Sequence, residues 1–395
     1  MEYTVFITQS IYPLFGGKTL ASNGYCRAFS KYTNLKVFSL YQSSNVPIPK
    51  AFEECGIKNV TFYETSARKR KNKSPFELFS QIKGKVTGTV PIYREFYQNI
   101  VDFLNCNQIN KVIVDHLGMC QYYFALRKKF PGMSFVYNSH NVEFINTKEE
   151  IENKRLISHA LAILKYKLRY NYEKRMVKES QYVFCISKSD LKIIQQEFSA
   201  PPEKLIFSKP FIKFNKVKEK SELQHTNNKI MIVGSMNWYP NVEGTIWFIE
   251  NVFLDLIKKN SRYKLYIVGN KPPEVLKDFE KKYPNNIEVT GFVESTEIYY
   301  KMCDISIIPV FRGTGAKIKV LESICRGIPT VCSDFAAKDY DISDEIMVAT
   351  SSEDFYNKIV LIDSSSEVRM HLYERMMNYI ANYYVLSEDV YGALR

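Results

Sequence analysis

A glycine-rich segment in the second half of the chain has residue types that could hold an anion. Gly313 and Gly315 follow the apolar run 305–309, and helical spacing begins near Ala316. Glycines let backbone amides approach a ligand closely, and the amino end of a helix carries partial positive charge. The segment predicts an anion site or, with equal weight, an ordinary turn between a strand and a helix.

Charged side chains at the start of the same helix suit a nucleotide. Lys317 and Lys319 could add positive charge beside a bound diphosphate. Glu322, about two turns into the helix, could accept hydrogen bonds from ribose hydroxyls. These three side chains favour a nucleotide-binding function for the segment.

Two histidines follow predicted strands in the first half. His140 comes after the apolar run 135–137, and the pair Asp115 and His116 follows the run 111–114. A histidine at a strand end can serve chemistry or can hydrogen-bond a neighbouring carbonyl, and both interpretations stay open. Asp115 and His116 are candidates for contact with an acceptor or a structural capping pair, and we rank them below His140.

Other enzyme classes lack their signatures here. The sequence contains no HExxH, P-loop or GxSxG motif, so zinc peptidases, P-loop kinases and serine hydrolases are not supported. Asp339 and Asp341 have the spacing of a metal-binding pair, but they lie in an acidic loop that we interpret as solvated. The eight cysteines show neither CxxC pairs nor zinc-ligand spacing, which is typical of reduced thiols in a cytoplasmic protein.

Short apolar runs alternate with segments of helical spacing along the first half. This alternation is typical of a parallel sheet with helical connections. The segment of about 148–179 has leucines at helix-compatible intervals and predicts one long or bent helix. The strands expected in this half are 5–7, 36–40, 111–114, 135–137 and 182–186.

A second series of strands and helices follows a change in composition. With 395 residues, 45% of them hydrophobic, the chain is long enough for two cores. A stretch rich in Lys, Ser and Asn covers 213–229, after which strands are expected at 230–234, 265–268, 287–289, 305–309 and 330–331. We therefore predict an α/β protein with two doubly wound, Rossmann-like domains facing each other across a cleft. The predicted domains are 1–208 and 209–378, with a C-terminal helix in 379–395 returning to the first.

The motifs resemble, in order and spacing, the group 1 (family 4) retaining glycosyltransferases with GT-B fold. The sequence Gly-x-Gly-x-Lys-x-Lys-Val-Leu-Glu of 313–322 is similar to their donor-binding signature. Matches elsewhere cover nearly the whole chain, and their agreement in order makes coincidence improbable. They are 139–143, 172–173 with 187–190, 234–241, 289–293 and 327–331.

The resemblance implies roles for individual residues. Glu322 would hold the nucleotide ribose, while Lys317, Lys319 and the amides near Gly315 would neutralise the diphosphate leaving group. His140 would stand beside the transferring sugar. The implied catalytic residues are His140, Lys317 and Glu322, and Asp115 and His116 are the acceptor-side candidates. The implied donor-binding residues are Gly16, Gly17, Gly234, Thr314, Gly315, Ala316, Lys317, Ile318, Lys319 and Glu322.

The implied chemistry needs neither a cofactor nor a metal ion. The co-substrate would be a UDP- or GDP-linked sugar, and the departing phosphate would help to deprotonate the acceptor hydroxyl. Catalysis would depend on orientation and on stabilising leaving-group charge.

The sequence departs from the family pattern at two places. Thr314 stands where many members carry a glutamate, which puts recognition of the donor sugar's hydroxyls in doubt. Ser235, Met236, Asn237 and Trp238 stand where others place an arginine and a lysine, for which Lys317 and Lys319 could compensate.

Basic residues are concentrated in two blocks. Lysine and arginine outnumber aspartate and glutamate by 54 to 42, with one block at 68–73 and a second at 154–178. Such blocks could meet an anionic membrane or glycan, or could be solvated faces. Signatures of common nucleic-acid-binding modules are absent, so nucleic acid is not an expected partner.

The chain is expected to be cytoplasmic, with peripheral contact at the inner face of the membrane. Its first residues lack the basic stretch of a signal peptide, and no run of about 18 apolar residues occurs. The expected acceptor is a glycan or a lipid-linked oligosaccharide of polysaccharide assembly in bacteria.

Two other functions remain open. A nucleotide-sugar 2-epimerase would share this architecture, but the five histidines give little support to its elimination chemistry. A non-catalytic, transferase-like subunit that binds a glycan or glycoprotein would be compatible with Thr314. Retention of Glu322, Lys317, Lys319 and His140 argues against that alternative.

Overall fold

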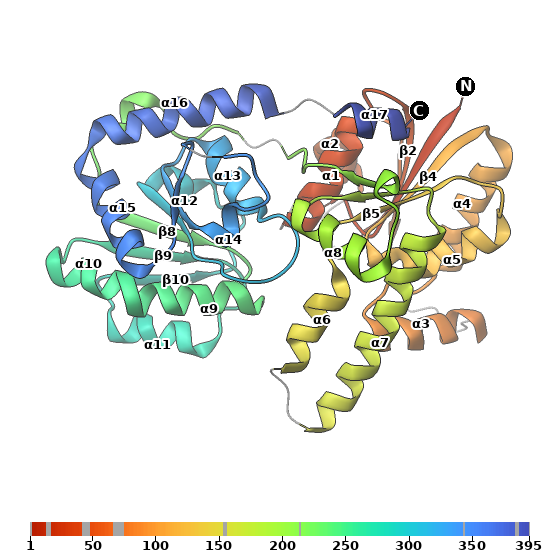
Figure 1. Ribbon diagram of the computed structural model, residues 1–395, viewed down its shortest axis with the longest axis horizontal. Helices are drawn as coiled ribbons and strands as arrows, with labels where there is room; N and C mark the ends of the chain where they lie inside the picture. The colour runs from red at the N-terminus through yellow and green to blue at the C-terminus, as the bar shows by residue number, and fades with distance from the viewer. Residues whose placement is uncertain are drawn as a thin grey trace. The chain divides into compact units, whose positions relative to one another are not determined.

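The computed structural model divides the chain into two compact units (Figure 1). It describes residues 2–12, 17–41, 48–65, 75–152, 156–212, 215–342, 344–383 and 387–394. The first unit comprises Met1–Phe211, Thr314–Ala316 and Leu386–Arg395, and the second comprises Ile212–Gly313 and Lys317–Val385. The sequence-based boundary lay between 208 and 209, close to the point where the second unit begins.

The first unit is built on a sheet of seven parallel strands in the order β3-β2-β1-β4-β5-β6-β7. Its central strands are continuous apolar runs because helices cover both faces of such a sheet. Strand order reverses between β1 and β4, which is where open sheets of this kind bind ligands. The strands are β1 Tyr3–Thr8, β2 Asn34–Tyr41, β3 Val60–Glu64, β4 Ile109–Asp115, β5 Phe135–Ser139, β6 Tyr182–Cys185 and β7 Leu205–Phe207.

Helices surround this sheet, and the last of them comes from the far end of the chain. In α17, the carbonyl of Leu394 accepts a hydrogen bond from Asn110 Nδ2 at 3.2 Å, and the ring of Tyr391 lies 5.5 Å from that of Tyr32. The helices are α1 Gly17–Phe29, α2 Ile48–Cys55, α3 Pro75–Thr87, α4 Arg94–Cys106, α5 Cys120–Lys129, α6 Glu143–Glu152, α7 Leu156–Glu179, α8 Lys188–Phe198 and α17 Glu388–Leu394.

The single long or bent helix predicted over 148–179 is wrong. The segment contains the end of α6 and the whole of α7, which pack against each other as a hairpin (Figure 1). The buried carboxylate of Glu173, in α7, accepts hydrogen bonds from the backbone amides of Glu143 and Phe144 at 3.3 and 3.2 Å. These amides are the unpaired donors of the first turn of α6, so the contact fixes the start of one helix beside the middle of the other.

The second unit repeats the design with six parallel strands in the order β10-β9-β8-β11-β12-β13. The strands are β8 Lys229–Val233, β9 Lys264–Val268, β10 Ile287–Gly291, β11 Ile305–Ile308, β12 Thr330–Ser333 and β13 Met347–Ala349. The helices are α9 Tyr239–Phe248, continued by a π-helical turn Ile249–Phe253, α10 Leu254–Lys259, α11 Glu274–Lys282, α12 Glu297–Met302, α13 Ile318–Arg326, α14 Asp334–Ala337, α15 Ser352–Ser364 and α16 Ser366–Tyr383.

The α/β class with two doubly wound parallel sheets is confirmed. Each strand expected from the sequence lies within or across an observed strand, whereas β3, β7 and β13 were not predicted. Among the described residues, no helix combines the length and apolar character needed to cross a bilayer.

Candidate functional site

A buried carboxylate organises the first unit where β1, β4 and β5 end. Asp115 is the last residue of β4, and its Oδ2 accepts hydrogen bonds from the hydroxyls of Thr8 and Ser22, both at 2.6 Å. Its Oδ1 accepts from Asn138 Nδ2 at 2.7 Å. Parallel strands bring their carboxyl ends to one edge of the sheet, which is why residues so distant in sequence meet there.

His140 is the fourth partner of this carboxylate. Its Nε2 lies 2.7 Å from Asp115 Oδ1, and both side chains are buried. Burial raises the pKa of Asp115, but the His140 charge and the hydrogen bonds from His140, Ser22 and Thr8 outweigh it and leave this pKa below its ordinary value. An ionised Asp115 therefore fixes the orientation of the His140 ring.

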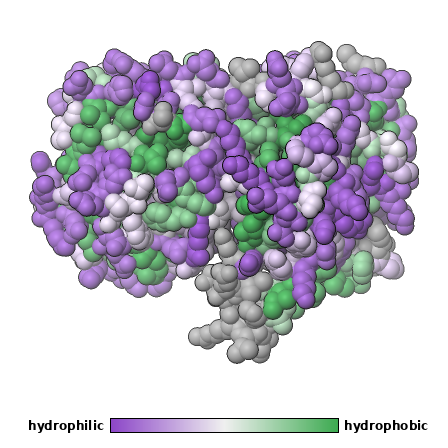
Figure 2. All heavy atoms as spheres, viewed as in Figure 1, coloured by the Kyte–Doolittle hydropathy of each residue, from purple (hydrophilic) through white to green (hydrophobic). Residues whose placement is uncertain are grey.

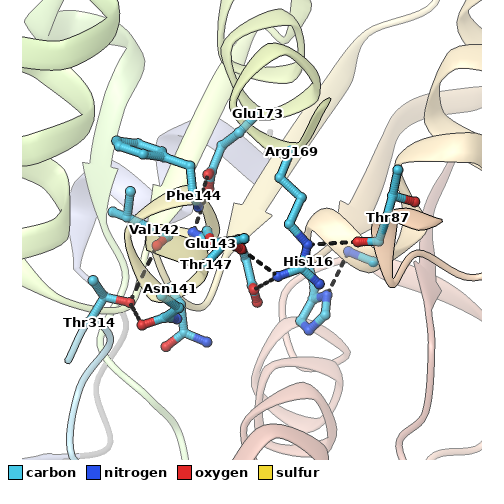
Figure 3. A network of polar contacts seen from close by, with 12 residues as sticks. Thr87, His116, Asn141, Val142, Glu143, Phe144, Thr147, Arg169, Glu173 and Thr314 are labelled. Atoms are coloured by element: carbon cyan, nitrogen blue, oxygen red, sulfur yellow. Dashed lines mark hydrogen bonds and ion pairs between the residues drawn. The ribbon is translucent and has the colours of Figure 1, made fainter. Parts of the chain in front are cut away.

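His116 lies next to this pair, with its ring 5.7 Å from that of His140. Its backbone has the left-handed φ of 71°. Its Nδ1 accepts a hydrogen bond from the Gly118 amide at 2.8 Å, so the proton of the neutral ring is on Nε2 (Figure 3). Burial, helped by the charges of Lys18, His140 and Arg169, lowers the pKa of His116 well below its ordinary value. His116 is therefore a neutral N–H donor, and its Nε2 has no hydrogen-bond partner within the described part of the chain.

Lys18 is a cation of this site that we did not predict. It stands in the first turn of α1, directly after Gly17, and its Nζ donates to Gln9 Oε1 at 2.9 Å. Surrounding protein desolvates its ammonium group and lowers its pKa to about 8, although Glu143 and Asp115 oppose this effect. A lysine after two glycines at a strand-to-helix turn was the available signal. Gly16 lies outside the described residues.

Arg169 links three elements beside the histidines (Figure 3). Its Nε donates to the Thr87 carbonyl at 2.7 Å, and its Nη1 donates to Glu143 Oε2 at 3.0 Å and Thr147 Oγ1 at 3.1 Å. The Arg169 charge is thus paired, and it joins α7 to the end of α3 and the start of α6.

Three residues of the predicted donor-binding segment 313–322, Thr314 to Ala316, belong to the first unit. The Thr314 hydroxyl donates to Asn146 Oδ1 at 2.9 Å, and the Gly315 amide donates to Asp190 Oδ2 at 2.9 Å. Gly315 has a φ of 75°, and a Cβ there would lie 2.0 Å from Asn141 Oδ1, so only glycine fits. Asp190 was not predicted as a partner. The Gly315 amide, which we expected to bind a diphosphate, donates its hydrogen bond to the Asp190 carboxylate in this structure.

In the second unit, Lys319 lies at the carboxyl end of β8. Its Nζ donates to Asn241 Oδ1 at 2.5 Å, and a Cβ added to Gly234 would lie 2.9 Å from that Nζ. Burial and the neighbouring charge of Lys317 lower the pKa of Lys319 to about 7, with Glu322 opposing. A desolvated ammonium group held at a strand end is suited to binding an anion that restores its charge.

Lys317 and Glu322 lie on either side of Lys319 in sequence. Lys317 is buried at the N-cap of α13, with its Nζ 5.1 Å from the Phe335 ring and 5.8 Å from the Trp238 ring. Glu322 Oε1 accepts from Arg326 Nη2 at 3.2 Å and lies 3.5 Å from Thr296 Oγ1. Burial raises the pKa of Glu322, and Arg326 and Lys319 offset this only in part. Cations and an acceptor carboxylate therefore meet at the start of one helix.

Comparison with known proteins identifies the region that contains this constellation. Residues 227–362 match the family model of the glycosyl transferases group 1. This part of the chain is therefore similar to the glycosyl transferases group 1. A relative described as an uncharacterized glycosyltransferase of Methanocaldococcus jannaschii is 29% identical over 253 residues, which cover 60% of this chain and 58% of that protein. The alignment thus spans less than two thirds of the relative's length.

Solved structures share the fold over nearly the whole chain. Anabaena HepE, solved in complex with UDP and glucose, has a TM-score of 0.65 at 12% identity and covers 97% of this chain and 96% of its own. WaaG, a glycosyltransferase involved in lipopolysaccharide biosynthesis, has a TM-score of 0.62 at 15% identity, with 99% of each chain covered. The group 1 resemblance and the GT-B fold class are confirmed. Membership of family 4 and the retaining outcome stay predictions.

The predicted site residues of the chain fall into two sets. Asp115, His116, His140 and Gly17 gather in the first unit with Thr314, Gly315 and Ala316. Gly234, Lys317, Ile318, Lys319 and Glu322 gather in the second. Their roles in binding and catalysis stay predictions.

One loop of the second unit differs in part from its prediction. The acidic loop was interpreted as solvated, but Asp339 and Tyr340 are buried, whereas Asp341 and Asp344 are exposed as expected. Asp339 and Tyr340 follow directly after α14 and pack in the interior, which the acidic composition of the loop does not indicate. Across the described ranges, no group of three or more His, Cys, Asp or Glu side chains has the arrangement of a metal site.

Proposed function

We propose that this chain is a retaining glycosyltransferase that moves a sugar from a nucleotide sugar to a glycan, a lipid-linked oligosaccharide or another surface-glycan acceptor. The observation that carries the proposal is the position of Lys319, held by Asn241 at the carboxyl end of β8 with Lys317 and Glu322 beside it. This is the ligand-binding edge of a doubly wound sheet.

The donor chemistry follows from the charges of that constellation. A nucleoside diphosphate leaving group would be neutralised by Lys317 and Lys319, and Glu322 would accept hydrogen bonds from the ribose. The complex of HepE with UDP and glucose makes UDP-linked sugars our first choice and GDP-linked sugars our second. Because two lysines supply the charge, we propose chemistry that does not depend on a metal ion.

The first unit would serve the transferring sugar and the acceptor. His140, fixed by Asp115, would stand beside the sugar, and the neutral Nε2–H of His116 would donate to an acceptor oxygen. The departing phosphate would take the acceptor proton, so these side chains would orient and stabilise rather than attack.

The acceptor is proposed from relatives. WaaG takes part in lipopolysaccharide biosynthesis, and a lipid-linked or polysaccharide acceptor at the cytoplasmic face of a membrane suits the basic surface of α7. The competing function is a non-catalytic subunit that binds a glycan or glycoprotein. This alternative is favoured by Thr314, which stands at the position where many family members have a glutamate. The Thr314 hydroxyl donates a hydrogen bond to Asn146.

The first experiment is a panel of UDP- and GDP-linked sugars, screened for thermal stabilisation and then for slow release of the nucleoside diphosphate. Stabilisation with release is expected and would name the donor. Stabilisation without release, in the presence of candidate acceptors as well, would favour the binding subunit. A lack of response to every donor would overturn the transferase proposal.

A further inference from the structure

Helix α3 turns its small and polar residues inward and its large apolar residues outward. Ser80 and Thr87 are buried, and the Ser80 hydroxyl donates to Gln121 at 2.8 Å. In contrast, Leu78 is 52% exposed, Phe79 67% and Ile82 55%. An amphipathic helix of a soluble domain buries its apolar face, so this orientation points to a partner for the outer face.

Helix α7 buries Met176 and Val177 near its end, but it too exposes large apolar side chains in its first half. Ala162 is buried, whereas Leu161 is 64% exposed and Leu164 46%. The two helices are in contact, with Arg169 Nε of α7 donating to the Thr87 carbonyl of α3. Figure 2 shows apolar side chains gathered on the surface over both helices. We name Leu78, Phe79, Ile82, Leu161 and Leu164 the α3–α7 surface.

Positive charge adjoins the α3–α7 surface. Between Lys165 and Lys178, the one carboxylate of α7 is Glu173, which is buried and accepts the amides of α6. Lys167, Lys174 and Lys178 are exposed cations of that stretch, whereas Arg175 is paired with Glu179 at the end of the helix, 3.1 Å away. Lys85 adds an exposed cation on α3. Exposed apolar side chains next to lysines are the features with which peripheral proteins bind an anionic bilayer.

We propose that the α3–α7 surface inserts its apolar side chains into an anionic lipid bilayer while the lysines of α7 contact the headgroups. This inference deepens the membrane contact included in the proposed function and rests on it for its purpose, which is access to a lipid-linked acceptor. A second copy of the chain is the weaker candidate, because a two-fold interface here would place the same cations opposite one another.

The test is co-sedimentation with vesicles of phosphatidylglycerol or phosphatidylcholine at low and high salt. The wild-type chain is expected to bind phosphatidylglycerol vesicles most strongly at low salt. Because insertion depends on apolar area, F79S/I82S and, separately, L161S/L164S are expected to weaken this binding by about tenfold or more. Ile298→Ser is the matched control, since Ile298 is 69% exposed on α12 of the second unit.

Circular dichroism and nucleotide-sugar binding without vesicles show whether each variant is folded. Wild-type affinity for vesicles in both folded double variants, or equal loss in Ile298→Ser, would overturn the proposal. The proposal would also be overturned if the wild-type chain did not bind phosphatidylglycerol vesicles. A wild-type dimer that the F79S/I82S substitutions dissociate would instead assign this surface to a second copy of the chain. A chain that binds vesicles through this surface yet binds no donor would refute the proposed function and leave the docking surface intact.

Discussion

The carboxylate of Asp115 lies 2.7 Å from Nε2 of His140, and three further donors share the same carboxylate. Every lone-pair direction of a buried anion is thereby occupied, so the His140 ring has one orientation. In a transferase that stabilises charge instead of forming a covalent intermediate, such a fixed ring is a means of orientation.

His140→Ala is expected to lower turnover by about 100-fold while leaving donor affinity within about twofold, because in the proposed function the ring would act on the reacting sugar and not on the nucleotide. Steady-state kinetics and donor titration measure the two effects separately. His225→Ala, which changes an exposed histidine, is the control. Normal turnover in His140→Ala would return this histidine to a structural role.

Nucleotide affinity is expected to fall as the pH rises above 7. The pKa of Lys319 is about 7 in the free protein, so the side chain is charged below that pH and neutral above it. A bound diphosphate favours the charged form, and affinity can drop by up to about tenfold per pH unit as a proton must be taken up on binding. Titration calorimetry with UDP at pH 7, 8 and 9, in buffers of different ionisation enthalpy, measures the affinity and the proton uptake. Lys319→Arg should flatten the profile, and an unchanged profile would contradict the assignment.

Glu322→Gln is expected to weaken nucleotide binding by about tenfold without unfolding the protein, since a charged acceptor for ribose hydroxyls is replaced and the helix remains. Calorimetry with UDP and with inorganic diphosphate distinguishes the ribose contact from the phosphate contact, because only UDP should lose affinity. Glu297→Gln, at an exposed position of α12, is the matched control. Equal losses for both ligands would place Glu322 elsewhere in the mechanism.

Stability is expected to decrease from about pH 5 to pH 8 through Glu173. Burial raises the pKa of Glu173 to about 8, from the ordinary value of 4.5, so the folded state binds the proton more tightly than the unfolded state. That stabilising effect is complete below the unfolded pKa and is lost as pH rises through 8, with a slope of at most about 1.4 kcal/mol per pH unit. Urea unfolding at pH 5, 6.5 and 8 measures it. The slope should diminish in Glu173→Gln and persist in Glu203→Gln, where the original carboxylate is exposed.

Strands buried on both faces were readable from the sequence because they appear as unbroken apolar runs, as β5 and β8 do. Strand β3 is only partly buried and β7 has three residues, so neither leaves such a run. The packing of α6 against α7 includes hydrogen bonds from the Glu143 and Phe144 amides to Glu173, and helical spacing in the sequence does not indicate such long-range contacts.

The candidate site was predictable to the same extent. Gly234, Lys319 and Glu322 lie in short motifs whose spacing predicted them as candidate donor-binding residues. Asn241 lies within the longer match 234–241, but its contact with Lys319 was not predicted. The hydrogen bond between them joins residues 78 positions apart in the sequence. The lowered pKa of Lys18 arises from the surrounding fold, which no local motif describes.

Helix α17 completes the first unit with residues that follow the entire second unit. During synthesis on the ribosome, the first unit would therefore lack its last helix until the whole second unit has been synthesised. Emergence of α17 from the exit tunnel would then be the event that allows Asn110 and Tyr32 to acquire their partners.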